Sequence, residues 1–419
     1  MPKRIKVGVV GCGYWGPNLI RNFRALPDCH LKMMCDINHE RLKHFKALYP
    51  EVERATDFNH MLNGVNLDAI VIATAVKLHY SMAKAALLAG KHTFIEKPLA
   101  GSSEQCEELI DIAAQKGVVL MAGHTFLYSP VVNKIKEIID NGDIGDIRYI
   151  CARRLNLGIF QKDFNVAWDL APHDLSIILS IMEELPIAVN CRGSAHITPE
   201  IQDVTTMWLT FRKQRSAVIH SSWLDPRKIR EMTIVGSKRM IVYDDVAPIE
   251  KIRIFDARVE RAPHYDTFAE FQYAYHYGDM YVPYIKQEEP LKNECQHFLD
   301  CIREGKRPLT DGKQGLELVR ILEASSESLK LGGAPVEFPH AQSGDAWVLP
   351  WNSRLSLDGA PVERMKAGPT LAGDRIARKQ KAYAGNGNGN GHSNGNGHGN
   401  GNGNGHTNGN GNGHSNGKD

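Results

Sequence analysis

Two short segments carry the side chains best suited to catalysis. The first, Glu96-Lys97-Pro98, directly follows a short predicted strand from Thr93 to Ile95. Proline restricts the residue before it to an extended conformation, which fixes the backbone of Lys97. A lysine held near a reacting hydroxyl can stabilise the negative charge that develops on oxygen. Taken alone, the tripeptide is equally compatible with a solvent-exposed lysine at a strand end.

The second segment, Asp169-Leu170-Ala171-Pro172-His173, precedes a predicted helix from Asp174 to Met182. If Asp169 lies just before or in the first turn of this helix, it shares a face with His173. A carboxylate in that place orients an imidazole and stabilises its protonated form, as a general base that removes an alcohol proton requires. The alternative is an N-cap aspartate beside a core histidine.

A glycine-rich loop near the N-terminus indicates a dinucleotide site. Gly11-Cys12-Gly13-Tyr14-Trp15-Gly16 follows a predicted strand and opens an amphipathic helix. In this context Gly11 permits a tight turn, Gly13 lets the backbone approach a pyrophosphate, and Gly16 lets the helix pack against the strand. The N–H groups and dipole of the helix then face the phosphates, with Tyr14 and Trp15 in the same loop.

An acidic residue at the end of the next predicted strand indicates which dinucleotide is bound. Asp36 ends the strand from Leu31 to Cys35. Its carboxylate can accept hydrogen bonds from both ribose hydroxyls and repels a 2′-phosphate, so NAD is favoured over NADP. Arg41 lies a few residues further on, where it can weaken this preference or serve only as an exposed helix cation.

The order of the predicted elements in the first third is that of a doubly wound α/β fold. Short apolar strands alternate with amphipathic helices. The predicted strands are Ile5–Val10, Leu31–Cys35, Asp68–Thr74, Thr93–Ile95 and Val118–Met121, and the predicted helices are Trp15–Leu26, Asn38–Leu48, His79–Leu88 and Ser103–Gln115. We therefore predict a parallel Rossmann sheet over residues 1–123, with Glu96 and Lys97 at its ligand-binding edge.

Residues 124–345 predict an α+β domain with a large, mostly antiparallel open sheet. After a helix from Val131 to Ile139, the strand-like runs are Ile147–Asn156, Ile187–His196, Val204–Phe211, Ser216–Trp223, Glu231–Val235, Met240–Tyr243 and Ile252–Phe255. We expect the helices Asp174–Met182, Asn293–Glu304 and Lys313–Leu329 to pack on one face of this sheet. The other face is then free to form an oligomer interface.

Composition excludes several other classes of protein. The 419 residues carry a net charge of +2 and show no Lys/Arg-rich block, so we expect no nucleic-acid ligand. The eight cysteines include no Cys-x-x-Cys pair, which is typical of reduced, buried thiols. We find no secretory signal and no apolar run of about 18 residues, so we expect a cytoplasmic protein without a membrane span.

The C-terminal region has a different composition. Patterning weakens over residues 346–384, which we interpret as an extended segment, and residues 385–419 are a Gly/Asn-rich tail that we expect to be disordered. The tail contains His392, His398, His406 and His414. We interpret it as solvated, with weak adventitious metal binding as the alternative, and we predict no specific metal site in the chain.

Several segments together resemble the glucose–fructose oxidoreductase/inositol dehydrogenase/MocA (Gfo/Idh/MocA) family. They are GVVGCGYWGPNLIRNF, IATAVKLHY, GKHTFIEKPLA, GHTFLYSP and WDLAPHD, and the similarity covers roughly residues 5 to 340. The glycine loop is generic, whereas Glu-Lys-Pro combined with Asp-x-x-x-His is much more specific. Within the family the chain looks most like nucleotide-sugar 3-dehydrogenases, which oxidise C3 of sugars of the UDP-N-acetylglucosamine type or their uronic acids.

The resemblance implies roles for individual residues. Lys97 matches a lysine that contacts substrate and nicotinamide, His173 matches the catalytic histidine, and Asp169 matches its carboxylate companion. The predicted NAD contacts are Gly11, Gly13, Tyr14, Trp15, Gly16, Asp36, Thr74, His79, Glu96 and Lys97. Candidates for the sugar or nucleotide pocket are Tyr128, Arg154, Asn156, Asn165 and Trp168, each of which can equally be part of the strand or loop structure. The resemblance also implies a homodimer or homotetramer.

One departure from the family pattern concerns the loop after the strand that ends near Thr74. The family commonly has Thr-Pro there, and this chain has Thr74-Ala75. Because alanine lacks the fixed φ of proline, we expect a changed loop that still binds NAD. Two alternatives to a nucleotide-sugar dehydrogenase remain: an inositol, free-monosaccharide or dihydrodiol dehydrogenase, and a non-catalytic NAD-binding regulator on the same fold.

Overall fold

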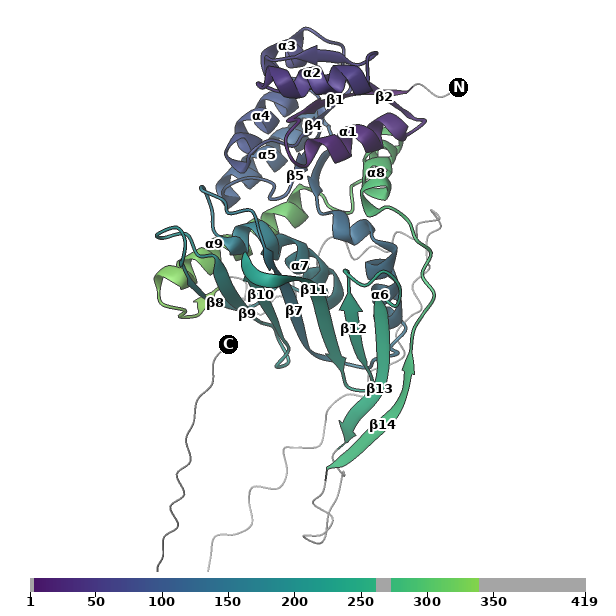
Figure 1. Ribbon diagram of the computed structural model, residues 1–419, viewed down its shortest axis with the longest axis vertical. Coiled ribbons are helices and arrows are strands. Elements are labelled where there is room, and N and C mark those ends of the chain that lie inside the picture. The colour runs from purple at the N-terminus through teal and green to yellow at the C-terminus, as the bar shows by residue number, and fades with distance from the viewer. Residues whose placement is uncertain (1–3, 261–272, 339–419) are drawn as a thin grey trace, which may run out of the picture. The chain divides into compact units, whose positions relative to one another are not determined.

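The computed structural model describes residues 4–260 and 273–338. Its first sheet has six parallel strands in the order β3-β2-β1-β4-β5-β6 (Figure 1). The strands are β1 (Ile5–Val10), β2 (Cys29–Cys35), β3 (Glu53–Ala55), β4 (Ala69–Ile72), β5 (His92–Glu96) and β6 (Leu120–Gly123). This order is that of a dinucleotide-binding Rossmann sheet, in which ligands lie beyond the carboxyl ends of the strands. The predicted parallel sheet is confirmed.

The helices of this part are α1 (Gly16–Ala25), α2 (His39–Leu48), α3 (Phe58–Asn63), α4 (Val76–Leu88) and α5 (Ser103–Lys116). Helices cover both faces of the sheet, so β4 is buried along its whole length, as its apolar sequence predicts. Asn38 caps α2 by accepting from the N–H groups of Glu40 and Arg41, which confirms the predicted cap. Sequence analysis did not find β3 and α3, because such short elements show little periodicity.

The second sheet has nine strands in the order β14-β13-β12-β11-β7-β10-β9-β8-β15. They are β7 (Ile147–Leu157), β8 (Ala188–Ser194), β9 (Val204–Thr210), β10 (Ser216–Ser222), β11 (Leu224–Gly236), β12 (Met240–Asp244), β13 (Ile252–Glu260), β14 (Ala274–Tyr281) and β15 (Val336–Glu337). All neighbouring strands are antiparallel except β7 and β10. The predicted mostly antiparallel sheet is thus confirmed, while β14 and β15 were not predicted.

Three helices lie against this sheet: α6 (Pro130–Asp140), α7 (Val166–Met182) and α9 (Gly312–Lys330), preceded by the 3₁₀ helix η1 (Thr125–Tyr128). The start predicted for α7 was wrong, since the helix begins at Val166 and contains Asp169, Pro172 and His173. Helix α9 joins the two sheets. Its Leu316 and Val319 belong to the core of the first sheet, and its Leu318, Ile321 and Leu322 to the core of the second.

Helix α8 (Pro290–Glu304) does not pack where the sequence predicted. It lies beside α1 and belongs to the core of the first sheet (Figure 1). The Phe298 ring contacts Phe23 and Phe94 edge-on, with centroids 6.3 and 5.8 Å apart. The expectation that this helix covers the antiparallel sheet is wrong, because its apolar side chains fill a space left between α1 and β5.

Some expectations fall on residues that the structure does not describe. The extended segment 346–384 and the tail 385–419, with its four histidines, lie outside the described residues. The domain boundaries at residues 123 and 345 remain predictions. Among the described helices, none is long and apolar enough to cross a membrane.

Candidate active site

The glycine loop joins β1 to α1 in the geometry that a pyrophosphate site requires. Gly11 has φ +94°, and a Cβ there would lie 2.5 Å from the carbonyl oxygen of Ala73. A Cβ on Gly16 would lie 1.9 Å from the carbonyl oxygen of Gly11. Gly13 meets no backbone, and its nearest neighbour is the Arg41 guanidinium at 3.5 Å. Two glycines therefore close the turn, and the third leaves its outer side free for a ligand's phosphates.

Asp36, at the carboxyl end of β2, is tied to this loop. Its carboxylate accepts the backbone N–H of Cys12 at 2.7 Å and that of Asn38 at 2.8 Å. Arg41 lies 3.7 Å from the same carboxylate. Each carboxylate oxygen retains lone pairs for a further donor, so Asp36 can accept ribose hydroxyls. The loop and Asp36 together fit NAD, whose nicotinamide accepts hydride when the cofactor is bound.

His79, which is 1% exposed, holds the loop after β4 in place. Its Nδ1 lies 2.8 Å from the carbonyl oxygen of Pro98, and its Nε2 lies 3.0 Å from that of Thr74. Burial lowers the pKa of His79. Both ring nitrogens are occupied by protein, so this histidine supports the cofactor loops and has no free polar atom for the cofactor. Its predicted role as a direct NAD contact stays a prediction.

Ala75, where the family has proline, is the N-cap of α4 with φ −66° and ψ 144°. This φ is the value that a proline ring imposes. The backbone at this residue is therefore compatible with the proline of the family pattern. The expected change of loop is not seen in the backbone of Ala75, because His79 fixes the carbonyl of the preceding residue.

Lys97 meets Asp169 where the two sheets come together. The Lys97 ammonium donates to the backbone carbonyl of Asp169 at 2.6 Å and lies 3.3 Å from its carboxylate. The indole N–H of Trp223 donates to the other carboxylate oxygen at 3.1 Å. Lys97 and Asp169 keep 19% and 23% of their side-chain surfaces exposed, so the pair is still accessible to a ligand. The structure thus brings Lys97 and Asp169 into direct contact.

His173 lies one helical turn after Asp169 in α7, but no hydrogen bond joins the two in the described structure. Its Nδ1 is buried without a partner, and its ring contacts Phe126 with centroids 5.2 Å apart. Burial lowers the pKa of His173 well below its ordinary value, and the nearby cations Lys97, Arg154 and Arg230 lower it further. The Asp169 carboxylate is held by Lys97 and Trp223 instead, so its expected role in orienting this imidazole stays a prediction.

A group of polar side chains surrounds the ends of β5 and β6. It comprises Glu96, which was predicted as an NAD contact, and three residues that sequence analysis did not single out: His124, Thr125 and Glu294. His124 and Glu294 are buried, and Glu96 and Thr125 are half-buried. Thr125 donates its hydroxyl to Glu294 at 2.6 Å. One carboxylate oxygen of Glu96, one of Glu294 and both ring nitrogens of His124 are buried without hydrogen-bond partners. Such orphaned groups are costly, so they mark a place where a polar ligand is accepted.

The ionisation of these groups is shifted by their surroundings. Burial raises the pKa of Glu96 to about 7, although the adjacent Lys97 opposes this shift. Burial and the neighbouring Glu96 raise the pKa of Glu294 well above its usual range. Burial lowers the pKa of His124 to about 3, and the Lys97 charge acts in the same direction. His124 is therefore uncharged at neutral pH, and the raised pKa of Glu294 favours its protonated form.

Two of the predicted pocket residues are buried and bonded to other parts of the protein. The Tyr128 hydroxyl contacts that of Thr310 at 3.0 Å, beneath β6. Arg154 forms two hydrogen bonds of 2.8 Å with Asp174, and its guanidinium lies 4.8 Å from the Phe126 ring centroid. Both side chains support the walls of the site, and direct substrate contact remains a prediction for each.

The other three pocket candidates lie at the start of α7 and the end of β7. Asn165 caps α7 by accepting from the N–H groups of Ala167 and Trp168. The Trp168 indole donates to Ser326 of α9 at 2.8 Å. Asn156 is partly exposed near the end of β7. These positions flank Asp169 in the chain, and their substrate contacts likewise stay predictions.

Three of the residues that sequence analysis did not single out had a signal in the sequence: His124, Thr125 and Glu294. His124 and Thr125 directly follow β6 at the same sheet edge as Lys97, within the segment GHTFLYSP. Glu294 lies on the apolar stripe of α8 with Leu291, Cys295 and Phe298, where an acidic residue is unusual. No local signal identifies Trp223, because only the second sheet brings it to Asp169. In the described residues, no cluster of three or more potential ligands that could hold a metal ion is present.

Comparisons with known proteins agree with this geometry. Residues 5–124 match the family model described as "Oxidoreductase family, NAD-binding Rossmann fold". Residues 132–242 match the model of the GFO/IDH/MocA C-terminal domain. The first region contains all six strands of the parallel sheet, and the second contains β7 to β11 and part of β12; together they contain Lys97, Asp169 and His173.

Curated relatives and solved structures extend the similarity along the chain. UDP-N-acetylglucosamine 3-dehydrogenase from Acidithiobacillus ferrooxidans is 26% identical over 74% of this chain and 93% of its own. Myo-inositol 2-dehydrogenase from Thermotoga maritima is 24% identical over 78% and 96%. The structure of the Acidithiobacillus enzyme superposes with a TM-score of 0.66, covering 78% of this chain and 99% of its own at 23% identity. GenD2 from gentamicin A biosynthesis, solved in complex with NAD, gives a TM-score of 0.68 over 81% and 97% at 18% identity.

Proposed function

Because the chain belongs to the Gfo/Idh/MocA family of NAD-dependent oxidoreductases, we propose that it oxidises a secondary alcohol of a nucleotide-linked sugar. The proposed substrate is a UDP-linked N-acetylhexosamine or its uronic acid, and the proposed position is C3. The observation that carries the proposal is the contact of Lys97 with Asp169 beside the carboxyl edge of the Rossmann sheet, with His173 near enough to feel the Lys97 charge. A relative that is a UDP-N-acetylglucosamine 3-dehydrogenase supports the choice of substrate.

The protein's own groups divide the work of the reaction. His173 is neutral, since burial and cations hold its pKa low, so it can accept the hydroxyl proton. Asp169 holds the Lys97 ammonium in place. This ammonium can stabilise the negative charge that develops on the substrate oxygen. Trp223 keeps the Asp169 carboxylate directed towards Lys97. Each of these contacts orients a reacting group before the alcohol loses its hydrogen.

The charges around His173 favour an anionic sugar. Lys97, Arg154 and Arg230 all oppose protonation of the imidazole. Arg154 is neutralised by the buried Asp174, whereas Arg230 keeps 39% of its side chain exposed and lies 3.5 Å from Asp245. A carboxylate on the substrate would offset this positive charge and make it easier for His173 to accept a proton. This supports the uronic acid as the better of the two proposed substrates.

The test is NADH formation with a panel of UDP-sugars, UDP-uronates, inositols and free monosaccharides, followed by absorbance. We expect turnover with a UDP-linked N-acetylhexosamine or its uronate. Activity only with inositols or free sugars would contradict the proposed substrate class but not the proposed dehydrogenase reaction. The inositol dehydrogenase relative makes this the leading alternative.

The role of His173 is tested by a variant. His173→Ala should lose turnover and keep NAD binding, measured by quenching of protein fluorescence. Full activity in that variant would remove the proposed base.

We also propose that the protein is a homodimer or homotetramer assembled through the open face of the second sheet. Tyr149 of β7 and Trp208 of β9 are 44% and 47% exposed. Large aromatic side chains exposed on a broad sheet are typical of an interface between subunits. Light scattering after gel filtration measures the mass. Trp208→Glu should shift the protein towards the monomer, and a monomeric wild type would contradict this part of the proposal.

A further inference from the structure

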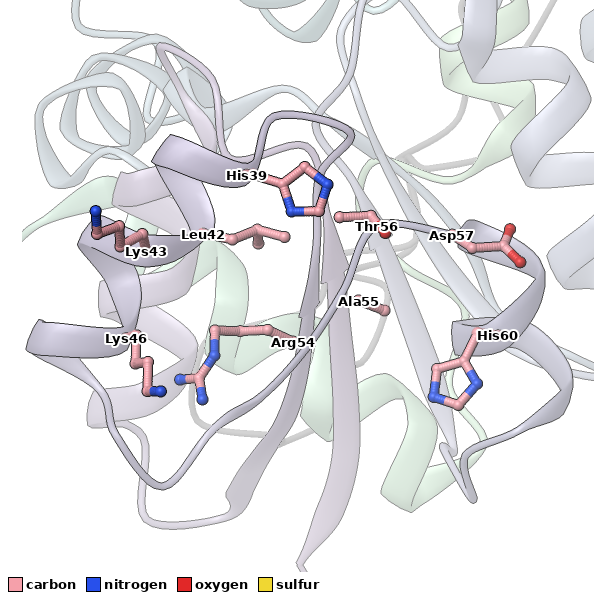
Figure 2. Close-up of a pocket in the computed structure, with 9 residues that line it drawn as sticks. All are labelled: His39, Leu42, Lys43, Lys46, Arg54, Ala55, Thr56, Asp57 and His60. Carbon is pink, nitrogen blue, oxygen red and sulfur yellow. The ribbon is translucent and has the colours of Figure 1, made fainter.

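An open pocket, called the cavity below, lies at the edge of the first sheet, away from the residues assigned above. Its volume is about 470 Å³, and it is bounded by α2, β3 and the start of α3. The lining residues are His39, Leu42, Lys43, Lys46, Arg54, Ala55, Thr56, Asp57 and His60 (Figure 2). Of these, Leu42 and Ala55 form the buried apolar floor, and the remainder are polar.

The cavity carries a net positive charge. Lys43, Lys46 and Arg54 contribute three formal positive charges and Asp57 one negative charge, which leaves +2 before either histidine is counted. The Asp57 carboxylate already accepts the N–H of Asn59 at 2.9 Å as the cap of α3. In Figure 2 the ends of Lys46 and Arg54 lie near each other on one side of the cavity, the end of Lys43 lies apart from them on the same side, and Asp57 lies on the other side.

Arg54, a half-buried residue, gives the strongest indication of a ligand site. Its Nη1 is buried, and it has no hydrogen-bond partner within the described residues. A guanidinium nitrogen withdrawn from water without an acceptor is costly, and such groups are normally paired. Among the residues that the structure describes, the one ion pair of Lys43 is with Glu40, at 3.9 Å. Both of those side chains are highly exposed, so this contact does little to neutralise the cavity.

The position of the lining residues on α2 separates this cavity from the cofactor site. His39, Lys43 and Lys46 follow the helical spacing of one exposed face of α2, which borders the cavity. Arg41 lies on a different face and reaches Asp36 and the glycine loop. The ligand of the cavity is therefore not the ribose or pyrophosphate that Asp36 and Gly13 would contact.

We propose that this cavity binds a small molecule carrying one or two phosphate groups, at a site distinct from the NAD and substrate sites. Arg54 would bind phosphate oxygens through its planar fork of N–H groups, with Lys43 and Lys46 as additional charges. The volume accommodates a phosphate group together with a small organic body, and Leu42 and Ala55 provide an apolar surface for it. Thr56, which directly follows β3 and lines the cavity, adds a hydroxyl donor.

The experiment is isothermal titration of the full chain saturated with NAD, so that the glycine loop is already occupied. The probes are inorganic pyrophosphate and glucose 6-phosphate, which separate a preference for diphosphates from one for phosphate monoesters. We expect one binding site per chain for at least one probe, and affinity that falls as salt is raised. Lys46→Gln and Arg54→Gln should each weaken binding about tenfold or more, since each removes a charged contact.

Lys116→Gln is the matched control, because Lys116 is an exposed cation at the end of α5, outside the cavity. It should leave binding unchanged. Lys46 is exposed, so Lys46→Gln is expected to fold normally, and unfolding curves without ligand check both cavity variants. Absence of binding by both probes would overturn the proposal. Binding that Lys116→Gln weakens as much as the cavity variants, or that the cavity variants leave unchanged, would overturn it equally.

Discussion

Replacement of the buried His124 should make the protein less sensitive to acid. His124 is 1% exposed, and neither ring nitrogen has a partner within the described residues. Its pKa falls from 6.5 to about 3 in the folded protein, because burial disfavours the charged ring. The unfolded chain therefore takes up a proton below about pH 6.5 that the folded chain does not bind. The free energy of unfolding is therefore unaffected by this residue well above pH 6.5, and it decreases as the pH falls from about 6.5 towards about 3.

The size of the effect follows from the two pKa values. Between about pH 7.5 and about pH 5.5, a histidine that titrates near 6.5 only when unfolded costs about 1.4 kcal/mol of unfolding free energy. His124→Gln removes this contribution whatever it does to stability at neutral pH. The difference in unfolding free energy between the two pH values should therefore be about 1.4 kcal/mol smaller in the variant than in the wild type.

Urea unfolding, followed by tryptophan fluorescence at the two pH values, measures how much the free energy of unfolding changes with pH in the variant and in the wild type. His30→Gln is the control, because His30 is exposed in β2 and lies outside the buried group around His124. That variant should keep the wild-type loss of stability in acid. An equal loss of stability in His124→Gln and in the wild type would refute the reasoning, since it would mean that the ring is protonated in the folded protein.

Three further substitutions test other parts of the site. Asp36→Ser should relax the preference for NAD over NADP by about 10- to 100-fold in the ratio of Kd values, because a charged acceptor is lost; an unchanged ratio would contradict the role of Asp36. Ala75→Pro should raise the free energy of unfolding by about 0.4–1 kcal/mol in urea, because φ is already −66° and the ring restricts only the unfolded chain. A loss of stability would show that the ring does not fit. Arg154→Met should destabilise the protein by about 3–5 kcal/mol, since Asp174 is left buried without its partner. Adding Asp174→Leu to that variant should restore much of the loss, and no recovery would argue against an unpaired charge as the cause.

The parts of the site that depend on neighbours in sequence could be predicted from the sequence. The glycine loop, the cap at Asn38 and the position of Lys97 after β5 each depend on a few consecutive residues. Turn chemistry and strand order determine such features locally, and the structure agrees at Gly11 and Gly16. The alternation of strands and helices likewise predicted the parallel sheet. Short elements such as β3 and α3 were not predicted, because segments of three or six residues show little periodicity.

Tertiary structure alone decided which side chains meet. Spacing within α7 suggested that Asp169 serves His173, but Lys97 and Trp223, both distant in sequence, hold that carboxylate. Glu294 reaches the site because α8 packs beside α1 instead of on the antiparallel sheet. Periodicity records which face of an element is buried and not which other element buries it, so contacts between distant segments cannot be read from one sequence. The sequence determined the cofactor loop and the identity of the reactive groups, and packing determined their partners and their charge states.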